Sequence, residues 1–142
     1  MSNQQTTTPH RNGLLFLCAG NGARSLMAEA FARFIGPAEM EYFSAGVAPI
    51  SEIHPHAVKA MREVGVDISE QQLKTIDAVP MEAISTIISL CEQDECPPLP
   101  EGIHHLSWPL PDPLQQTDMD EGGLQAFRRV RDQIRELVSR LF

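Results

Sequence analysis

The residues best suited to chemistry lie between Leu14 and Ser25. A short apolar run ends at Cys18, a turn with two glycines follows, and Arg24 stands where a helix is expected to begin. Backbone N–H groups of this turn can point at an anion, helped by the positive end of the helix, and the Arg24 guanidinium can hold two oxygens of a tetrahedral oxyanion. The same positive field favours the thiolate form of Cys18, which is the form that attacks. The segment therefore predicts an oxyanion-binding loop with a sulfur nucleophile at its base.

The predicted loop supplies backbone donors and one guanidinium to the anion. Its residues are Ala19, Gly20, Asn21, Gly22, Ala23, Arg24 and Ser25. Ser25 can donate a hydrogen bond to the Cys18 thiolate or can serve the amino terminus of the helix, and both roles stay open. Asn21 suits a left-handed backbone position better than a substrate contact. The alternative for Cys18 is a buried cysteine that ends a core strand, but a glycine-rich turn beside an arginine is poor core material.

Composition limits the classes of function. The chain has 142 residues, of which 42% are hydrophobic, and a net charge of −8, which fits one globular domain over residues 13–142. Nucleic acids and anionic membranes require a basic footprint that this chain lacks, and no apolar run is as long as a membrane span. Residues 1–12 are polar, without a hydrophobic signal region, and are expected to form a disordered tail. Three cysteines without a secretion signal fit a reducing cytoplasm, and nothing in the sequence demands a second subunit, so we expect a monomer.

Strands and helices alternate along the predicted domain. Apolar runs predict strands over residues 13–18, 41–45, 84–90 and 104–108, and helical patterns cover residues 24–35, 55–64 and 123–141. This order predicts an α/β fold: a single-domain, four-stranded parallel sheet flanked by helices on both faces. Ligands bind such sheets beyond the carboxyl ends of the strands. Cys18, Cys91 and Asp112 follow three of the predicted strands, so we expect them to meet at one edge.

Asp112 lies in a stiff loop. Pro111 and Pro113 flank it and restrict the backbone on both sides. A general acid must be aimed at the oxygen it protonates, and a rigid loop serves that need. An ordinary Asp-Pro turn is the alternative.

Residues 17–29, LCAGNGARSLMAE, resemble the anion loop of the low-molecular-weight protein tyrosine phosphatases, and more closely that of their relatives, the thioredoxin-coupled arsenate reductases. The resemblance extends over about residues 13–141. It continues through residues 42–46 (YFSAG), 54–57 (HPHA), 63–69 (EVGVDIS), 91–97 (CEQDECP), 108–109 (WP), 112–113 (DP) and 127–132 (FRRVRD).

This resemblance implies a three-cysteine reductase. Cys18 would attack arsenate held by Arg24 and the loop, while Asp112 protonates the departing oxygen. Cys91 would then attack Cys18 and release arsenite, and Cys96 would attack Cys91. Thioredoxin or another thiol reductant would reduce the resulting disulfide. Phosphate and sulfate would bind as analogue anions, and no cofactor is implied.

The chain departs from the family pattern at three places, of which the first two concern cysteines. Ala23 stands where many members have a second cysteine. Only four residues separate Cys91 from Cys96, which is shorter than expected for the thioredoxin-coupled reductases and leaves the identity of the reductant open.

Some of these reductases bind potassium near the loop through an asparagine, a glutamate, a serine and an aspartate. Asn21, Glu29 and Ser44 match three of these ligands, but Lys74 stands where the aspartate would be. We expect an ammonium group to replace the cation there, and hence no metal requirement.

Two other functions compete with the reductase. A phosphatase would hydrolyse aryl phosphate monoesters through a Cys18 phosphocysteine, but such phosphatases usually have an aromatic residue just after Asp-Pro, and here Leu114 follows. A zinc-binding module could use two cysteines and two histidines. These residues are Cys91, Cys96, His104 and His105. Their spacing matches no familiar zinc finger, and adjacent histidines on a strand point to opposite faces.

Overall fold

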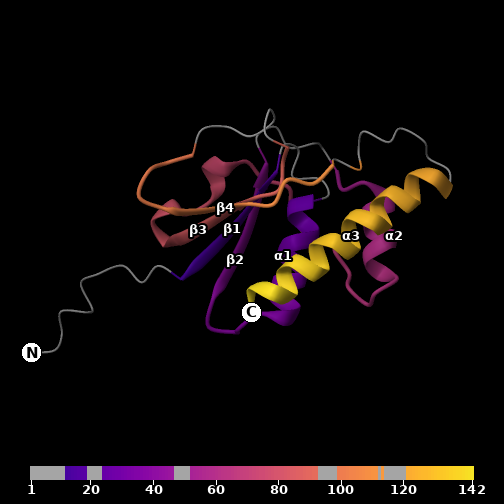
Figure 1. Ribbon diagram of the computed structural model, residues 1–142, viewed down its shortest axis with the longest axis horizontal. Helices are drawn as coiled ribbons and strands as arrows, with labels where there is room; N and C mark the ends of the chain where they lie inside the picture. The colour runs from indigo at the N-terminus through magenta and orange to yellow at the C-terminus, as the bar shows by residue number, and fades with distance from the viewer. Residues whose placement is uncertain (1–11, 19–23, 47–51, 93–98, 112, 114–120) are drawn as a thin grey trace, which may run out of the picture.

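The computed structural model describes residues 12–18, 24–46, 52–92, 99–111, 113 and 121–142. The elements follow one another as β1 (Gly13–Cys18), α1 (Arg24–Ile35), β2 (Glu41–Gly46), α2 (Pro55–Arg62), η2 (Ile76–Ala78), η3 (Met81–Ala83), β3 (Ile84–Ser89), β4 (His104–Ser107) and α3 (Glu121–Leu141) (Figure 1). None of the helices in these ranges has the length and apolar character needed to cross a lipid bilayer.

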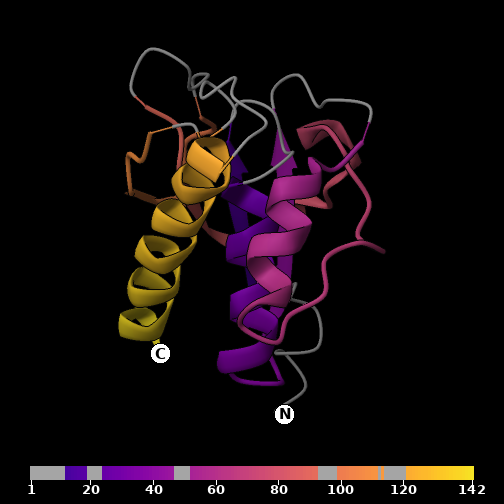
Figure 2. The same cartoon turned by 90° about the vertical axis from the view of Figure 1, so that its right-hand side faces the viewer.

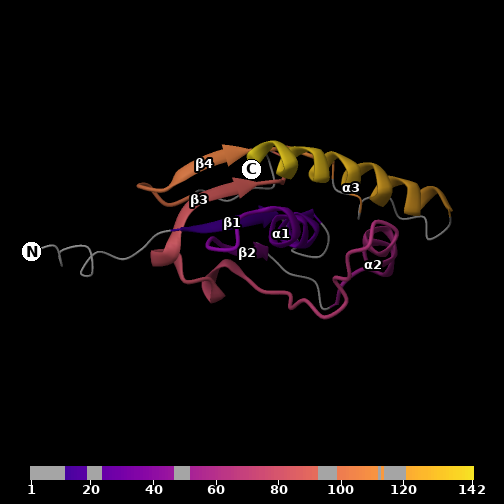
Figure 3. The same cartoon turned by 90° about the horizontal axis from the view of Figure 1, so that it is seen from below.

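The four strands form one parallel sheet in the order β2-β1-β3-β4. Figure 3 shows this order, with the labels running from β4 at the top through β3 and β1 to β2. Every residue of the central strand β1 is buried, as expected for a continuous apolar run in a parallel sheet covered on both faces. Because the strands are parallel, their carboxyl ends meet at one edge, where β1 ends with Cys18 paired to Gly46 of β2.

The two faces of the sheet carry separate hydrophobic clusters because successive side chains of a strand point to opposite sides. Phe16 and Ile88 face the larger cluster, to which α1, α2 and α3 contribute; α2 and α3 stand in front of the strands in Figure 2. Leu15, Leu17 and Ile87 face the smaller cluster. The prediction of a four-stranded parallel sheet is confirmed, and both faces are covered. The short 3-10 helices η2 and η3 cover the smaller cluster, with Ile76 of η2 and Met81 of η3 packed against it.

Local signals explain where the helices begin and end. α1 stops before Gly36, where a Cβ atom would overlap the Tyr42 hydroxyl and lie 2.8 Å from the Ala32 carbonyl oxygen, so only glycine fits. α2 begins after His54, whose side chain accepts a hydrogen bond from the His56 N–H at 3.0 Å and caps the helix. α2 ends at Arg62, two residues before the predicted end, because the chain turns toward Gly65 with a φ of 84°.

Candidate active site

Cys18 and Ser25 form a buried pair at the carboxyl end of β1. Cys18 is the last residue of the strand and is 2% exposed, and Ser25 lies in the first turn of α1 and is fully buried. The Cys18 Sγ and Ser25 Oγ atoms are 3.0 Å apart. Cys18 is not part of a disulfide. When it ionises, a thiolate can only accept, so the Ser25 hydroxyl becomes the donor. The pair thus has the geometry that thiolate stabilisation requires.

Arg24 is buried at the start of α1, only 1% exposed. Its Nη1 donates to the Leu110 carbonyl oxygen at 2.9 Å and to the Leu90 carbonyl oxygen at 3.3 Å. Leu90 follows β3, and Leu110 lies three residues beyond β4. Both acceptors are backbone carbonyls, and they orient the guanidinium. Arg24 is therefore held among the strand ends as a cation, which is what an oxyanion site needs.

Cys91 lies at the same edge as Cys18. The Leu90 N–H donates to the Leu17 carbonyl oxygen at 2.7 Å, which extends the pairing of β1 with β3 by one residue. Cys18 follows Leu17 and Cys91 follows Leu90, so both sulfur-bearing residues come one position after this hydrogen bond. Cys91 is 1% exposed and disulfide-bonded. Cys96, the other predicted relay residue, lies outside the described residues.

Backbone hydrogen bonds join the residues just before Asp112 to the residues just before Cys91. The Leu110 N–H donates to the Leu90 carbonyl oxygen at 3.2 Å, and the Trp108 N–H donates to the Ser89 carbonyl oxygen at 2.8 Å. The chain after β4 is thereby fixed alongside the chain after β3. Asp112 itself lies outside the described residues.

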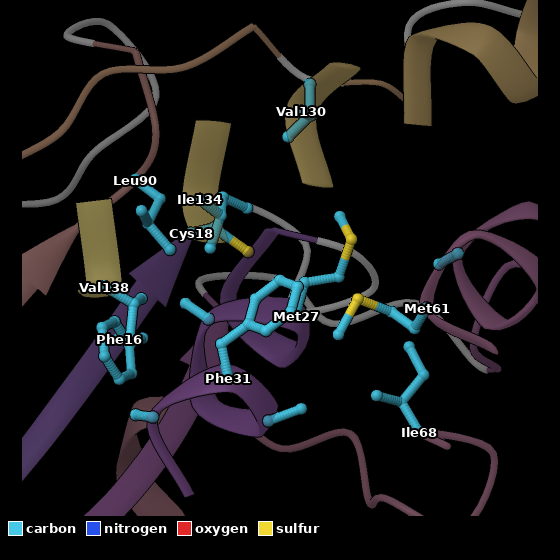
Figure 4. Packing of buried hydrophobic residues seen from close by; sticks show 14 of the residues in the cluster. Phe16, Cys18, Met27, Phe31, Met61, Ile68, Leu90, Val130, Ile134 and Val138 are labelled. Atoms are coloured by element: carbon cyan, nitrogen blue, oxygen red, sulfur yellow. The ribbon is translucent and has the colours of Figure 1, made fainter. Parts of the chain in front are cut away.

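The structure brings together four of the predicted site residues at one sheet edge. They are Cys18, Arg24, Ser25 and Cys91. In Figure 4, Cys18 and Leu90 lie beside Ile134 of α3, and all three residues belong to the same buried cluster. The other residues of the predicted loop lie outside the described residues; they are Ala19, Gly20, Asn21, Gly22 and Ala23.

A buried carboxylate braces α1 against β2 behind the site. Glu29 is 5% exposed. Its Oε1 accepts from the Ser44 hydroxyl at 2.5 Å, and its Oε2 accepts from Arg33 Nη2 at 2.6 Å. Lys74 was expected to replace the potassium ion. Arg33 forms an ion pair with Glu29, and Lys74 Nζ donates to the Gln72 carbonyl oxygen at 3.4 Å. The spacing of Glu29 and Arg33, four residues apart on a helix, is the sequence signal for this pair.

The histidines of β4 lie on the exposed edge strand. His105 Nε2 is 3.0 Å from the Ser89 hydroxyl, so that ring has a hydrogen-bond partner within the sheet. Within the ranges that the structure describes, no cluster of three or more histidine, cysteine or acidic side chains could hold a metal ion.

The sequence profile described as low molecular weight phosphotyrosine protein phosphatase matches residues 13–142. The chain belongs to this family. Within the family, an arsenate reductase of Halalkalibacterium halodurans is 39% identical to this chain over 123 residues, which are 85% of this chain and 88% of that protein.

Two solved structures extend the comparison. An arsenate reductase in the phosphate binding state is 35% identical, with a TM-score of 0.76 over 92% of this chain and 95% of the other. A thioredoxin-dependent arsenate reductase from Corynebacterium glutamicum is 29% identical, with a TM-score of 0.66 over 94% of this chain and 62% of the other. The resemblance seen in the sequence to this family and to its arsenate reductases is confirmed.

Proposed function

We propose that this protein is an arsenate reductase in which Cys18 attacks arsenate and Cys91 and Cys96 pass the oxidation to a thiol reductant of the thioredoxin type. The observation that carries the proposal is the placement of Cys18 and Cys91 one residue beyond the Leu17–Leu90 hydrogen bond. A phosphatase needs the first cysteine but not the second. The relatives named arsenate reductase support the same choice.

The first step forms a bond between sulfur and arsenic. The Cys18 thiolate, held by the Ser25 hydroxyl at 3.0 Å, attacks the arsenic atom of arsenate. Arg24 and the backbone of residues 19–23 hold the oxygens and stabilise the charge that develops on them. Asp112 gives its proton to the departing oxygen, which leaves as water. The product is an arsenate thioester on Cys18.

The second step carries the redox chemistry. The Cys91 thiolate attacks the Cys18 sulfur, and the pair of electrons in the sulfur–arsenic bond stays with arsenic. Arsenic(V) thereby becomes arsenic(III), which leaves as arsenite, and a Cys18–Cys91 disulfide remains. Cys96 then attacks Cys91 and frees the Cys18 thiolate. A Cys18 thiol outside any disulfide and a disulfide-bonded Cys91 are compatible with this sequence of events.

The setting follows from the chemistry. The cycle needs reduced thiols, so we place the enzyme in a reducing cytoplasm. Its net charge of −8 gives no basic footprint for nucleic acid or an anionic membrane, and the site assembles within one chain, which fits a monomer. We assign the activity to residues 13–142 and leave the tail, residues 1–12, outside the catalytic domain.

The second candidate is hydrolysis of aryl phosphate monoesters through a Cys18 phosphocysteine. Cys18 and the buried Arg24 favour it, because a thiolate and a guanidinium suit phosphate as well as arsenate. It leaves the position of Cys91 without a role.

The experiment compares both activities in one preparation. Arsenate-dependent oxidation of NADPH is followed with thioredoxin and thioredoxin reductase, beside hydrolysis of para-nitrophenyl phosphate. We expect turnover of arsenate, and loss of both activities in Cys18→Ser. Hydrolysis without any arsenate turnover would make the protein a phosphatase instead.

A further inference from the structure

A groove runs along α3 beside the stretch that leads to Asp112. Its first part is a cavity of about 480 Å³ between α3 and the two prolines that flank Asp112, Pro111 and Pro113. Its second part, of about 410 Å³, shares Asp132 and Gln133 with the first and continues toward the carboxyl end of α3. We call the two parts together the α3 groove.

The floor of the α3 groove is apolar. Leu110, Pro113, Ala126 and Val130 line it and are themselves buried. A floor of this kind, open to solvent and framed by polar side chains, is the usual anatomy of a contact surface for another protein.

Among the described charged side chains on the rim of the α3 groove, one arginine lies outside any ion pair. Asp132 Oδ1 accepts from Arg131 Nε at 2.8 Å, and Glu136 accepts from Arg140 at 2.8 Å, so the acidic rim groups are already paired. Of the described residues beside the groove, Arg129 takes part in no ion pair. Arg129 can therefore pair with a carboxylate that a partner presents.

The groove adjoins the redox site. Leu110 lines the groove, and its N–H donates to the carbonyl oxygen of Leu90, the residue directly before Cys91. Val130 lines the groove and also belongs to the buried cluster that contains Cys18 (Figure 4). A protein that reaches the Cys91 disulfide from this side therefore lies over the groove.

Resting on the proposed function, we propose that the α3 groove is the docking surface for the protein reductant, a dithiol protein of the thioredoxin type. The apolar surface around its dithiol covers the floor near Leu110, and a carboxylate beside it meets Arg129. One reductant thiolate attacks the Cys91 disulfide to give a mixed disulfide, and the second thiolate resolves it. Two electrons pass to this protein, whose disulfide becomes two thiols, and the dithiol of the reductant becomes a disulfide.

The test measures reduction of the Cys91 disulfide without arsenate. Oxidised protein is the disulfide substrate for thioredoxin, thioredoxin reductase and NADPH, and a parallel sample is reduced by dithiothreitol and followed by thiol titration. Arg129→Glu is expected to lower kcat/KM for thioredoxin about fivefold, through KM, with the dithiothreitol rate unchanged. Arg62→Glu is the matched control, since Arg62 is an exposed arginine on α2 that does not line the groove.

Several results would overturn the proposal. They are an unchanged thioredoxin rate in Arg129→Glu, an equal loss in Arg62→Glu, and thioredoxin reduction no faster than that by dithiothreitol. A concentration-dependent dimer that Arg129→Glu dissociates would assign the groove to a second copy of the chain. The proposed function is tested separately. If arsenate is not turned over but thioredoxin reduces the disulfide as expected, only the identity of the substrate is wrong.

Discussion

The hydrogen bond between Ser25 and Cys18 makes a quantitative prediction. Ser25→Ala removes the hydroxyl that lies 3.0 Å from Sγ in a buried pair. A hydrogen bond to a charged group contributes about 1.5–3 kcal/mol, so the thiolate population falls roughly 10- to 100-fold at a pH where the thiol dominates. The remaining thiolate is more nucleophilic, with a Brønsted slope of about 0.4–0.5, which offsets about half of the loss on a logarithmic scale. The expected net effect is a roughly 3- to 10-fold slower reaction of Cys18.

The assay is alkylation of reduced protein by iodoacetamide, followed at the Cys18 peptide by mass spectrometry over about pH 5 to 8. Ser85→Ala is the matched control, because Ser85 Oγ donates to the Gly13 carbonyl oxygen, at the other end of β1. If Ser25→Ala and Ser85→Ala alkylate at the same rate across this range, Ser25 does not stabilise the thiolate.

Three further predictions concern charge. Because Arg33 already pairs with Glu29, replacing sodium by potassium at equal ionic strength should change the rate of arsenate reduction less than about twofold, roughly 0.4 kcal/mol in the barrier. A larger gain in rate would contradict this prediction. The variant Arg33→Met is expected to acquire a response to potassium. Burial lowers the pKa of His54 below its ordinary 6.5, so protonation of His54 opposes folding. The melting temperature should therefore fall as the pH drops below 6.5, and it should fall less in His54→Asn. A melting temperature that does not change with pH would refute this prediction. Hydrogen bonds from Arg128 lower the pKa of Glu63 from 4.5 to about 2. The stability that the Glu63 carboxylate contributes is therefore present above pH 4.5 and is lost toward pH 2. Urea titrations of Glu63→Gln should lack that part of the acid dependence.

Local sequence signals predicted the elements that carry the site. The apolar run before Cys18 and the Gly36-Pro37 break placed β1 and α1 at their observed bounds, Gly13–Cys18 and Arg24–Ile35. Both signals act within a few residues, so no tertiary information was needed. The short 3-10 helices that cover the second face of the sheet were not predicted, because the residues from Ile76 to Ala83 have no helical repeat long enough to detect.

The contacts that hold the site were less accessible from the sequence. Arg24 donates to carbonyl oxygens of Leu90 and Leu110, 66 and 86 residues away. Backbone acceptors carry no residue-type signal, so only the packed sheet identifies them. The Glu29–Arg33 pair had a local signal in its helical spacing, whereas the accompanying bond from Ser44 depends on how α1 packs against β2.

The most direct test of the account is to trap the relay between Cys18 and Cys91. Cys96→Ser is fully reduced, freed of reductant, treated with arsenate, and digested for peptide mapping under conditions that block thiol exchange. We predict a Cys18–Cys91 disulfide in an amount equal to the arsenite released, because the residue that would resolve it is missing. Arsenite release with Cys18 and Cys91 unlinked, or no arsenite at all from protein that still hydrolyses an aryl phosphate, would contradict the three-cysteine reductase.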